Sequence, residues 1–246
     1  MFPLKDNIPT DRFPVVTVML IALNVLAYFF FQQGTISLGD PSNADFLQNL
    51  VDFAYIPCEL TGETPCDVPQ GTAADWVTVF TAMFMHGGLL HLGGNMLFLW
   101  IFGNNVEDSM GPFRFIVFYL LSGVAATALQ TAINPASDVP NIGASGAVAG
   151  VLGGYLLLFP RARVVTVIFI IFFFTIIELP AILILGFWFL QQALFGYFGL
   201  TDGSGEGGGV AYFAHIGGFA FGLLAIKLFA SEQRRRRQIE RVGGLA

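Results

Sequence analysis

Residues 143–159 read GASGAVAGVLGGYLLLF, an apolar, glycine-rich stretch with a single serine, Ser145, near its start. Small residues at this density are typical of a helix packed inside a membrane protein, where they let neighbouring backbones approach closely. Further apolar runs, several near the roughly 20 residues that a membrane span needs, lie on both sides of it. They cover residues 14–31, 113–133, 180–198 and 213–229, together with a run that ends at Phe102 and starts at Val77 or at His91, depending on where the helix enters the membrane.

The composition also indicates that the protein lies in a lipid bilayer. Hydrophobic residues make up 55% of the 246 residues and charged residues 11%, whereas an average soluble domain has about 25% charged residues. A soluble domain of this size could not bury so much apolar surface. We therefore expect a multi-pass integral membrane protein.

The charges are segregated along the chain. Residues 34–76 contain seven Asp and Glu but no Lys or Arg, whereas the C-terminal residues 231–246 carry Arg234–Arg237 and Arg241. Cytoplasmic loops are enriched in Lys and Arg, so the acidic segment is expected outside and both termini in the cytoplasm. A basic segment beside a span is expected to contact anionic lipid, and we expect no nucleic-acid partner.

The apolar stretch 164–198 is too long for one span and has Pro180 near its middle. Two full spans there would place the basic tail on the acidic side, against the charge rule. We therefore expect residues 164–179 to lie at the cytoplasmic interface and Pro180 to open the fifth span. The expectation is an all-α bundle of six transmembrane helices over residues 14–230, with cytoplasmic segments 1–13 and 231–246 and a long outer loop 34–76.

Glycines four residues apart occur in two of these runs. Gly146 and Gly150 form one pair, and Gly218 and Gly222 form the other. Each pair predicts a helix face that another helix approaches closely. Each pair also follows a polar residue, Ser145 in one run and His215 in the other.

The two cysteines, Cys58 and Cys66, both fall in the acidic segment. A disulfide between them is plausible if that segment is outside the cell. Such a bond would be a structural link within a loop.

The three histidines, His86, His91 and His215, lie in or at the ends of apolar runs, where an ionisable residue suggests function. His86 and His91 are five residues apart and do not share a helix face, so we expect neither a metal site nor a cofactor. His91 and Asn95 are four apart and do share a face. Together they offer two hydrogen-bond donors to a developing negative charge.

Ser145 stands where a span begins after a short polar loop. At a helix N-terminus, free backbone N–H groups and the helix dipole stabilise negative charge, and Gly143 and Gly146 allow a substrate carbonyl to come close. This pattern fits a serine nucleophile. The alternative is that Ser145 simply caps the helix.

Three motifs together resemble the rhomboid family of intramembrane serine proteases. They are GASGA at 143–147, AHIGG at 214–218, and His91-Leu-Gly-Gly-Asn95 after His86-Gly-Gly. The resemblance implies a Ser145–His215 dyad without an aspartate, and an oxyanion site from His91, Asn95, Gly143 and the Ser145 N–H. It also implies cleavage of single-span membrane proteins near the outer face of the membrane, which we expect to be the plasma membrane of a prokaryote.

The resemblance has two departures. The family often carries an aromatic residue one turn after the nucleophile, but this chain has Ala149 there, and Phe213 and Phe219 are the candidates to replace it. A Trp-Arg pair common in the family's first loop is absent, because Val77 follows Trp76. Two other functions remain open: a non-catalytic rhomboid-like protein that binds membrane clients, and a small channel or transporter.

Overall fold

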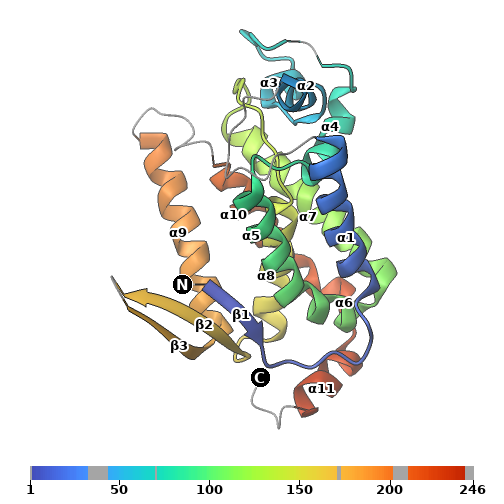
Figure 1. Ribbon diagram of the computed structural model, residues 1–246, viewed down its shortest axis with the longest axis vertical. Helices are drawn as coiled ribbons and strands as arrows, with labels where there is room; N and C mark the ends of the chain where they lie inside the picture. Colours follow the sequence, from blue (N-terminus) through green and yellow to red (C-terminus); the bar gives the residue numbers. More distant parts are fainter. Residues whose placement is uncertain (1, 33–43, 70, 171–172, 202–209, 242–246) are drawn as a thin grey trace.

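The computed structural model describes residues 2–32, 44–69, 71–170, 173–201 and 210–241, so parts of the predicted loop 34–76 and tail 231–246 lie outside the described residues. Most of the described chain is helical (Figure 1). The α-helices are α1 (Val15–Leu26), α2 (Ala44–Phe53), α3 (Pro57–Thr61), α4 (Asp75–Thr81), α5 (Leu89–Phe98), α6 (Asn104–Met110), α7 (Pro112–Ile133), α8 (Ser145–Leu158), α9 (Ala181–Thr201), α10 (Tyr212–Phe229) and α11 (Glu232–Arg241). Two short π-helices are η1 (Ala27–Phe31) and η3 (Leu99–Gly103), and η2 (Ala82–Phe84) is a short 3-10 helix.

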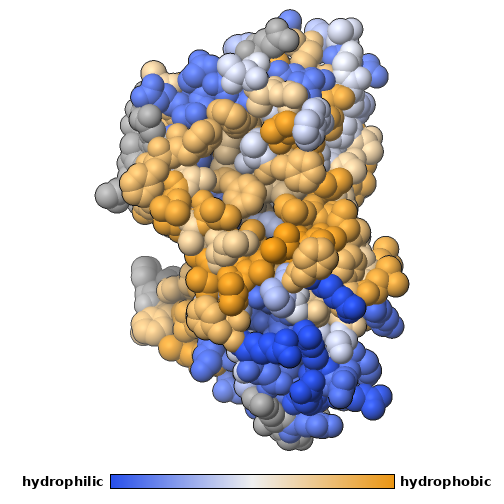
Figure 2. Space-filling model, turned by 90° about the vertical axis from the view of Figure 1, so that its right-hand side faces the viewer, coloured by the Kyte–Doolittle hydropathy of each residue, from blue (hydrophilic) through white to orange (hydrophobic). Residues whose placement is uncertain are grey.

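Each of the six predicted apolar runs contains a helix. Among the described residues, three helices, α7, α9 and α10, are long and apolar enough to cross a membrane, and a bent pair, Asp75–Phe84 with Leu89–Met110, makes a fourth candidate. The helices Val15–Phe31 and Ser145–Leu158 are apolar but shorter. On the face that Figure 2 shows, a hydrophobic band crosses the middle of the molecule between more hydrophilic ends.

The second apolar run begins as two helices rather than one. The sequence left open whether it starts at Val77 or at His91, and the structure has helix on both sides of a bend of 81°. The bend falls at residues 85–88, where Gly88 is extended and α5 begins directly after it. His91 therefore lies in the first turn of α5, close to the bend.

Helix α8 lies at the centre of the bundle and packs against α10 through glycines. A Cβ atom placed on Gly218 would overlap the carbonyl oxygen of Gly146, and one placed on Gly222 would overlap the carbonyl oxygen of Gly150. The two predicted glycine pairs thus face each other, and the backbones of α8 and α10 are in direct contact.

The expectation of an all-helical chain needs one correction, a three-stranded antiparallel sheet. Its strands are β1 (Phe2–Asp6), β2 (Arg163–Ile170) and β3 (Phe173–Pro180), in the order β1-β2-β3. Val165 pairs with Lys5 on one side and with Glu178 on the other. β-branched and aromatic residues dominate β2 and β3 and favour strands, so the segment expected at the interface is largely a hairpin.

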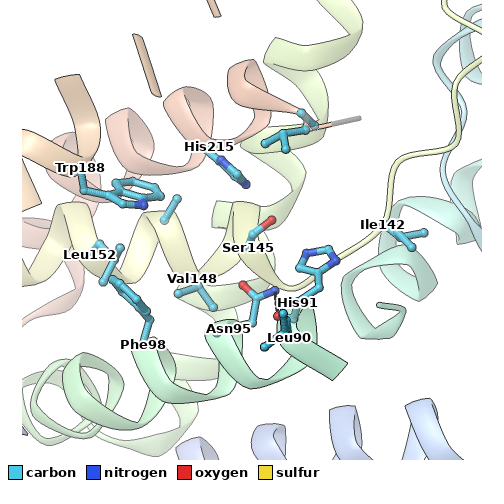
Figure 3. Close-up of a pocket in the computed structure, with 14 residues that line it drawn as sticks. Leu90, His91, Asn95, Phe98, Ile142, Ser145, Val148, Leu152, Trp188 and His215 are labelled. Atoms are coloured by element: carbon cyan, nitrogen blue, oxygen red, sulfur yellow. Dashed lines mark hydrogen bonds between the residues drawn. The ribbon is translucent and has the colours of Figure 1, made fainter. Parts of the chain in front are cut away.

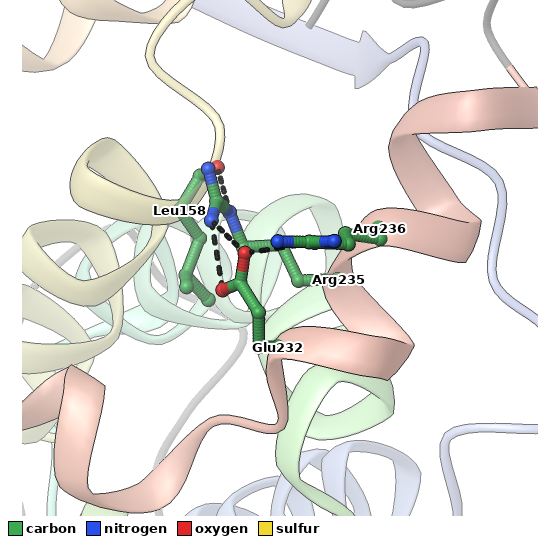
Figure 4. Close-up of polar contacts among 4 residues, drawn as sticks. All are labelled: Leu158, Glu232, Arg235 and Arg236. Carbon is green, nitrogen blue, oxygen red and sulfur yellow. Dashed lines mark hydrogen bonds and ion pairs between the residues drawn. The ribbon is translucent and has the colours of Figure 1, made fainter.

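The end of the molecule that carries the sheet and α11 is rich in polar contacts. Glu107 of α6 accepts hydrogen bonds from the backbone N–H groups of Val16 (3.0 Å) and Thr17 (2.8 Å), and so caps the start of α1. In Figure 4, Glu232 pairs with Arg235 and Arg236, while Arg235 Nε also donates to the Leu158 carbonyl at the end of α8 (3.2 Å).

The opposite end carries the acidic segment, with α2 and α3 at its tip (Figure 1). A disulfide joins Cys58 to Cys66, with Cα atoms 5.7 Å apart. Tyr55 and Asn141 exchange two backbone hydrogen bonds of 3.1 and 2.8 Å, which tie this segment to the loop that leads into α8. The start of α8, and with it Ser145, is therefore held at this end of the bundle.

Candidate active site

Ser145, His215, His91 and Asn95 line one cavity of about 350 Å³. The cavity is bounded by α5, α8, α9 and α10, and Figure 3 shows the four side chains directed toward its interior. These residues lie up to 124 positions apart in the chain, from His91 to His215. The fold thus brings together the polar residues that the sequence singled out.

Ser145 is the first residue of α8 and is half-buried. Its backbone N–H lies in the first turn, where the helix supplies no acceptor. Gly143, two residues earlier, has φ +124°, a conformation that favours glycine. The Gly143 N–H donates to the Ala82 carbonyl (2.8 Å), so this group is already used and Gly143 contributes space.

That space is shared by His91 and Ser145. A Cβ atom placed on Gly143 would lie 2.8 Å from His91 Nε2 and 3.4 Å from Ser145 Oγ. His91 Nδ1 accepts a hydrogen bond from the Gly87 N–H (3.3 Å), so a neutral His91 carries its ring proton on Nε2. The donor nitrogen of His91 therefore lies on the side of Gly143.

Asn95 lies one turn after His91 on α5 and is buried. Its Nδ2 donates to the His91 carbonyl (3.1 Å), which orients the carboxamide along the helix. An amide nitrogen has two hydrogens, so one remains to be donated into the cavity. His91 and Asn95 together give the cavity two side-chain donors beside Ser145.

His215 lies in the first turn of α10, and its imidazole points toward the Ser145 hydroxyl (Figure 3). The preceding residue, Ala214, donates its backbone N–H to the side-chain oxygen of Gln130 on α7 (3.1 Å). The glycine contact between α8 and α10 brings the two helices close at this level. The position of His215 relative to Ser145 is thus set by α7 and α8 as well as by α10.

Two residues of α9 that the sequence did not single out contact His215. Gln192 Oε1 lies 2.7 Å from His215 Nδ1, and the Trp188 ring lies 5.8 Å from the imidazole, centroid to centroid, at 38°. Trp188 therefore takes the place left by Ala149. The Phe219 ring stacks on Phe189 at 4.6 Å, and Trp188 is the aromatic ring that the described residues place against His215.

His86, the third histidine, lies outside the cavity lining and is fully buried. Its backbone N–H and carbonyl bond to the side chain of Gln32 (2.9 and 2.7 Å), and its ring meets the edge of the His91 ring at 5.1 Å. Within the described ranges no three His, Cys, Asp or Glu side chains are grouped to hold a metal ion. His86 supports the bend and the ring of His91.

Fold and site together define a helical membrane protein in which a serine and a histidine from two glycine-packed helices face one cavity. The chain belongs to the rhomboid family: the rhomboid domain matches residues 73–232. It is accordingly an integral membrane protein.

Three relatives illustrate the relationship. Rhomboid protein 1, mitochondrial, of Saccharomyces cerevisiae is 30% identical over 170 residues, covering 65% of this chain and 45% of the yeast protein. Rhomboid protease GluP of Bacillus subtilis is 32% identical over 143 residues, 58% of this chain and 24% of GluP. The putative rhomboid protease YdcA, also of Bacillus subtilis, is 31% identical over 160 residues, 64% of this chain and 70% of YdcA. The chain thus spans less than half the length of the first two relatives, and the family includes proteins named as proteases.

Proposed function

We propose that this chain is an intramembrane serine endopeptidase that hydrolyses peptide bonds of membrane proteins with Ser145 as nucleophile and His215 as general base. The observation that carries the proposal is the shared cavity, into which both side chains point from adjacent helices. A serine hydroxyl is a weak nucleophile until a neighbouring base removes its proton. Of the two histidines in the cavity, a neutral His91 has its Nδ1 lone pair occupied by the Gly87 N–H, so we assign the role of base to His215.

The reaction follows from these positions. Ser145 Oγ attacks the substrate carbonyl carbon while His215 takes the hydroxyl proton, and the carbonyl π electrons move to its oxygen. When this intermediate collapses, the C–N bond breaks and His215 passes its proton to the leaving amine. A water molecule then attacks the acyl-enzyme ester with His215 again as base, which releases the carboxylic acid and restores Ser145.

The negative oxygen of the intermediate needs donors on the side away from His215. His91 Nε2–H, the second hydrogen of Asn95 Nδ2 and the N–H of Ser145 are the groups available there. We propose that they form the oxyanion site, since donors fixed before reaction stabilise developing charge at little reorganisation cost. Gly143 leaves the room that the oxyanion occupies.

The proposed setting is a six-span protein with both termini in the cytoplasm, in the plasma membrane of a prokaryote. The site lies at the end of the bundle tied to the acidic segment, which the charge rule places outside. Substrates would then be cut near the outer membrane face. Proteins with a single transmembrane helix are the proposed substrates, because a helix without neighbours unwinds most easily at its end.

The experiment is cleavage of a fluorescent single-span substrate by the purified chain in liposomes. Cleavage by the wild type that is lost in both Ser145→Ala and His215→Ala, with folding intact, supports the proposal. Cleavage that persists in Ser145→Ala contradicts it. A wild type that binds a panel of such substrates without cutting any would instead favour a client-binding role.

A further inference from the structure

Gln192 contacts His215 in a way that sets where the imidazole proton lies. Its Oε1 is 2.7 Å from His215 Nδ1. An amide oxygen only accepts hydrogen bonds, so Nδ1 must donate and must carry the ring proton. A neutral imidazole has one such proton, which leaves Nε2 as the nitrogen with a free lone pair.

Gln192 is also a polar side chain buried in an apolar helix bundle. Among the described residues of α9, it is the one polar side chain that is buried, at 7% exposure. A polar group inside an apolar bundle is unfavourable unless it is hydrogen-bonded. The neighbouring Gln191 is exposed, whereas Gln192 is buried.

Trp188 adds a second contact from the same face of α9. It lies four residues before Gln192, which on a helix is one turn away on the same side. Its ring lies against the imidazole of His215 and also near Phe219, at 6.1 Å. Thus one side of the His215 ring meets an aromatic surface while Nδ1 meets an acceptor.

We propose that Gln192 is a positioning residue that holds His215 in the tautomer and orientation needed to deprotonate Ser145, with Trp188 supporting the ring. The proposal rests on the proposed function of Ser145 and His215. Because both supports come from α9, the base is fully set only while α9 lies against α10. Stacking of Phe189 on Phe219 (4.6 Å) and contact of Phe195 with Tyr212 also hold α9 against α10.

The first test compares Gln192→Met with the matched control Gln191→Met in the liposome cleavage assay. Methionine keeps the approximate length of glutamine but does not offer an amide acceptor. The expected result is a kcat lower by roughly 10- to 100-fold for Gln192→Met with KM nearly unchanged, and wild-type kinetics for Gln191→Met. Gln192→Glu keeps an acceptor oxygen and should recover most of the activity.

The second test reads the tautomer without measuring activity. The chain has three histidines, so the ring signals of ¹⁵N-histidine protein can be assigned to His215 by the spectrum of His215→Gln. The wild type should show His215 protonated at Nδ1, and Gln192→Met should show a mixture of tautomers. A wild-type His215 protonated at Nε2 would overturn the proposal even if Gln192 variants fold poorly.

The outcomes separate this proposal from the proposed function. If the wild type cleaves, Ser145→Ala does not, and Gln192→Met stays within about twofold of the wild-type kcat, the positioning role alone is wrong. If Ser145→Ala still cleaves, the serine mechanism itself is wrong. Equal loss of activity in Gln191→Met and Gln192→Met would also overturn the positioning role, since it would show a general effect of the substitution on α9.

Discussion

Gly143 illustrates how a single residue shapes the candidate site. Its φ of +124° lies in the region that favours glycine, and a Cβ atom there would be 2.8 Å from His91 Nε2. Both the backbone conformation and the available space therefore require glycine. The space is the one that the proposed oxyanion occupies, next to the Ser145 hydroxyl.

Gly143→Ala should lower kcat by at least about tenfold, because the added methyl group would both strain the backbone and displace the His91 ring. The measurement is cleavage of the single-span substrate, with thermal unfolding as a check that the protein remains folded. Gly93→Ala is the matched control, since a Cβ atom on Gly93 would meet nothing within 4 Å. Equal activity of Gly143→Ala and Gly93→Ala would contradict the role given to Gly143.

The residues that face the cavity differ in how far the sequence could predict them. Ser145, His91, Asn95 and His215 stand out because each is a polar residue beside glycines in an apolar run. Gln192 is also a polar residue in an apolar run, and that signal could have identified it. That Gln192 contacts His215 could not be predicted, because the contact joins α9 to α10. No local sequence pattern specifies how these two helices are rotated relative to each other.

Among the helices, α8 and α10 are in direct backbone contact. Gly146 and Gly150 meet Gly218 and Gly222 backbone to backbone. This contact places Ser145 near His215, because Ser145 directly precedes Gly146 and His215 lies three residues before Gly218. The sequence predicted these faces from spacing alone, since the spacing of four residues is a local feature.

Gly222→Ala should destabilise the protein by about 1–3 kcal/mol, the usual cost of inserting a group into a packed interior. The added Cβ atom would overlap the carbonyl oxygen of Gly150, which is backbone and cannot rotate away. Thermal unfolding in detergent measures the effect. Gly186→Ala on α9 has open space around it and should leave the unfolding temperature unchanged; a similar loss in both variants would contradict the packing argument.

The three-stranded sheet is the opposite case, because local sequence patterns did not predict it. Residues 164–179 are apolar enough to be taken for a membrane-associated segment. The length of this segment does not reveal that the chain turns back on itself. The pairing of β2 with β1 joins residues about 160 positions apart, such as Lys5 and Val165. Pairing at that distance depends on the whole fold, so it could not be inferred from the segment itself.

At the scale of the whole molecule, the end that carries the sheet and α11 has a buried acid outside the spans. Asp6 is 7% exposed and accepts hydrogen bonds of 2.6 Å from Asn105 Nδ2 and from the Tyr155 hydroxyl. Burial raises the pKa of Asp6 from its ordinary value of 3.8 to about 7. Asp6 thus links the N-terminal strand to α6 and α8 in a pH-dependent way.

Between pH 3.8 and about pH 7, Asp6 keeps its proton in the folded protein and loses it in the unfolded chain. The free energy of unfolding should therefore fall as pH rises from about 4 to about 7. Asp6→Asn, which cannot ionise, should weaken this dependence. Unfolding temperatures in detergent at about pH 5 and about pH 8 measure it. Asp67→Asn, a change at an exposed position, is the control, and an unchanged pH dependence in Asp6→Asn would exclude Asp6 as its source.

The distribution of charge over the two ends predicts the orientation in the membrane. In a Cys58→Ser, Cys66→Ser background, a cysteine at Thr64 should react with an impermeant thiol reagent added to intact cells. A cysteine at Gln233 should react only after the membrane is opened, because α11 and its arginines are expected inside. Both positions are exposed. Labelling of Gln233→Cys from outside would contradict the proposed topology.

Covalent labelling can establish whether His215 activates Ser145 as a nucleophile. The purified protein in liposomes is treated with a fluorophosphonate, and the modified residue is identified by mass spectrometry of its peptides. We expect a single adduct on Ser145 that is strongly reduced in His215→Ala. An unmodified Ser145 in folded wild-type protein, or equal labelling of Ser145 in the absence of His215, would contradict it.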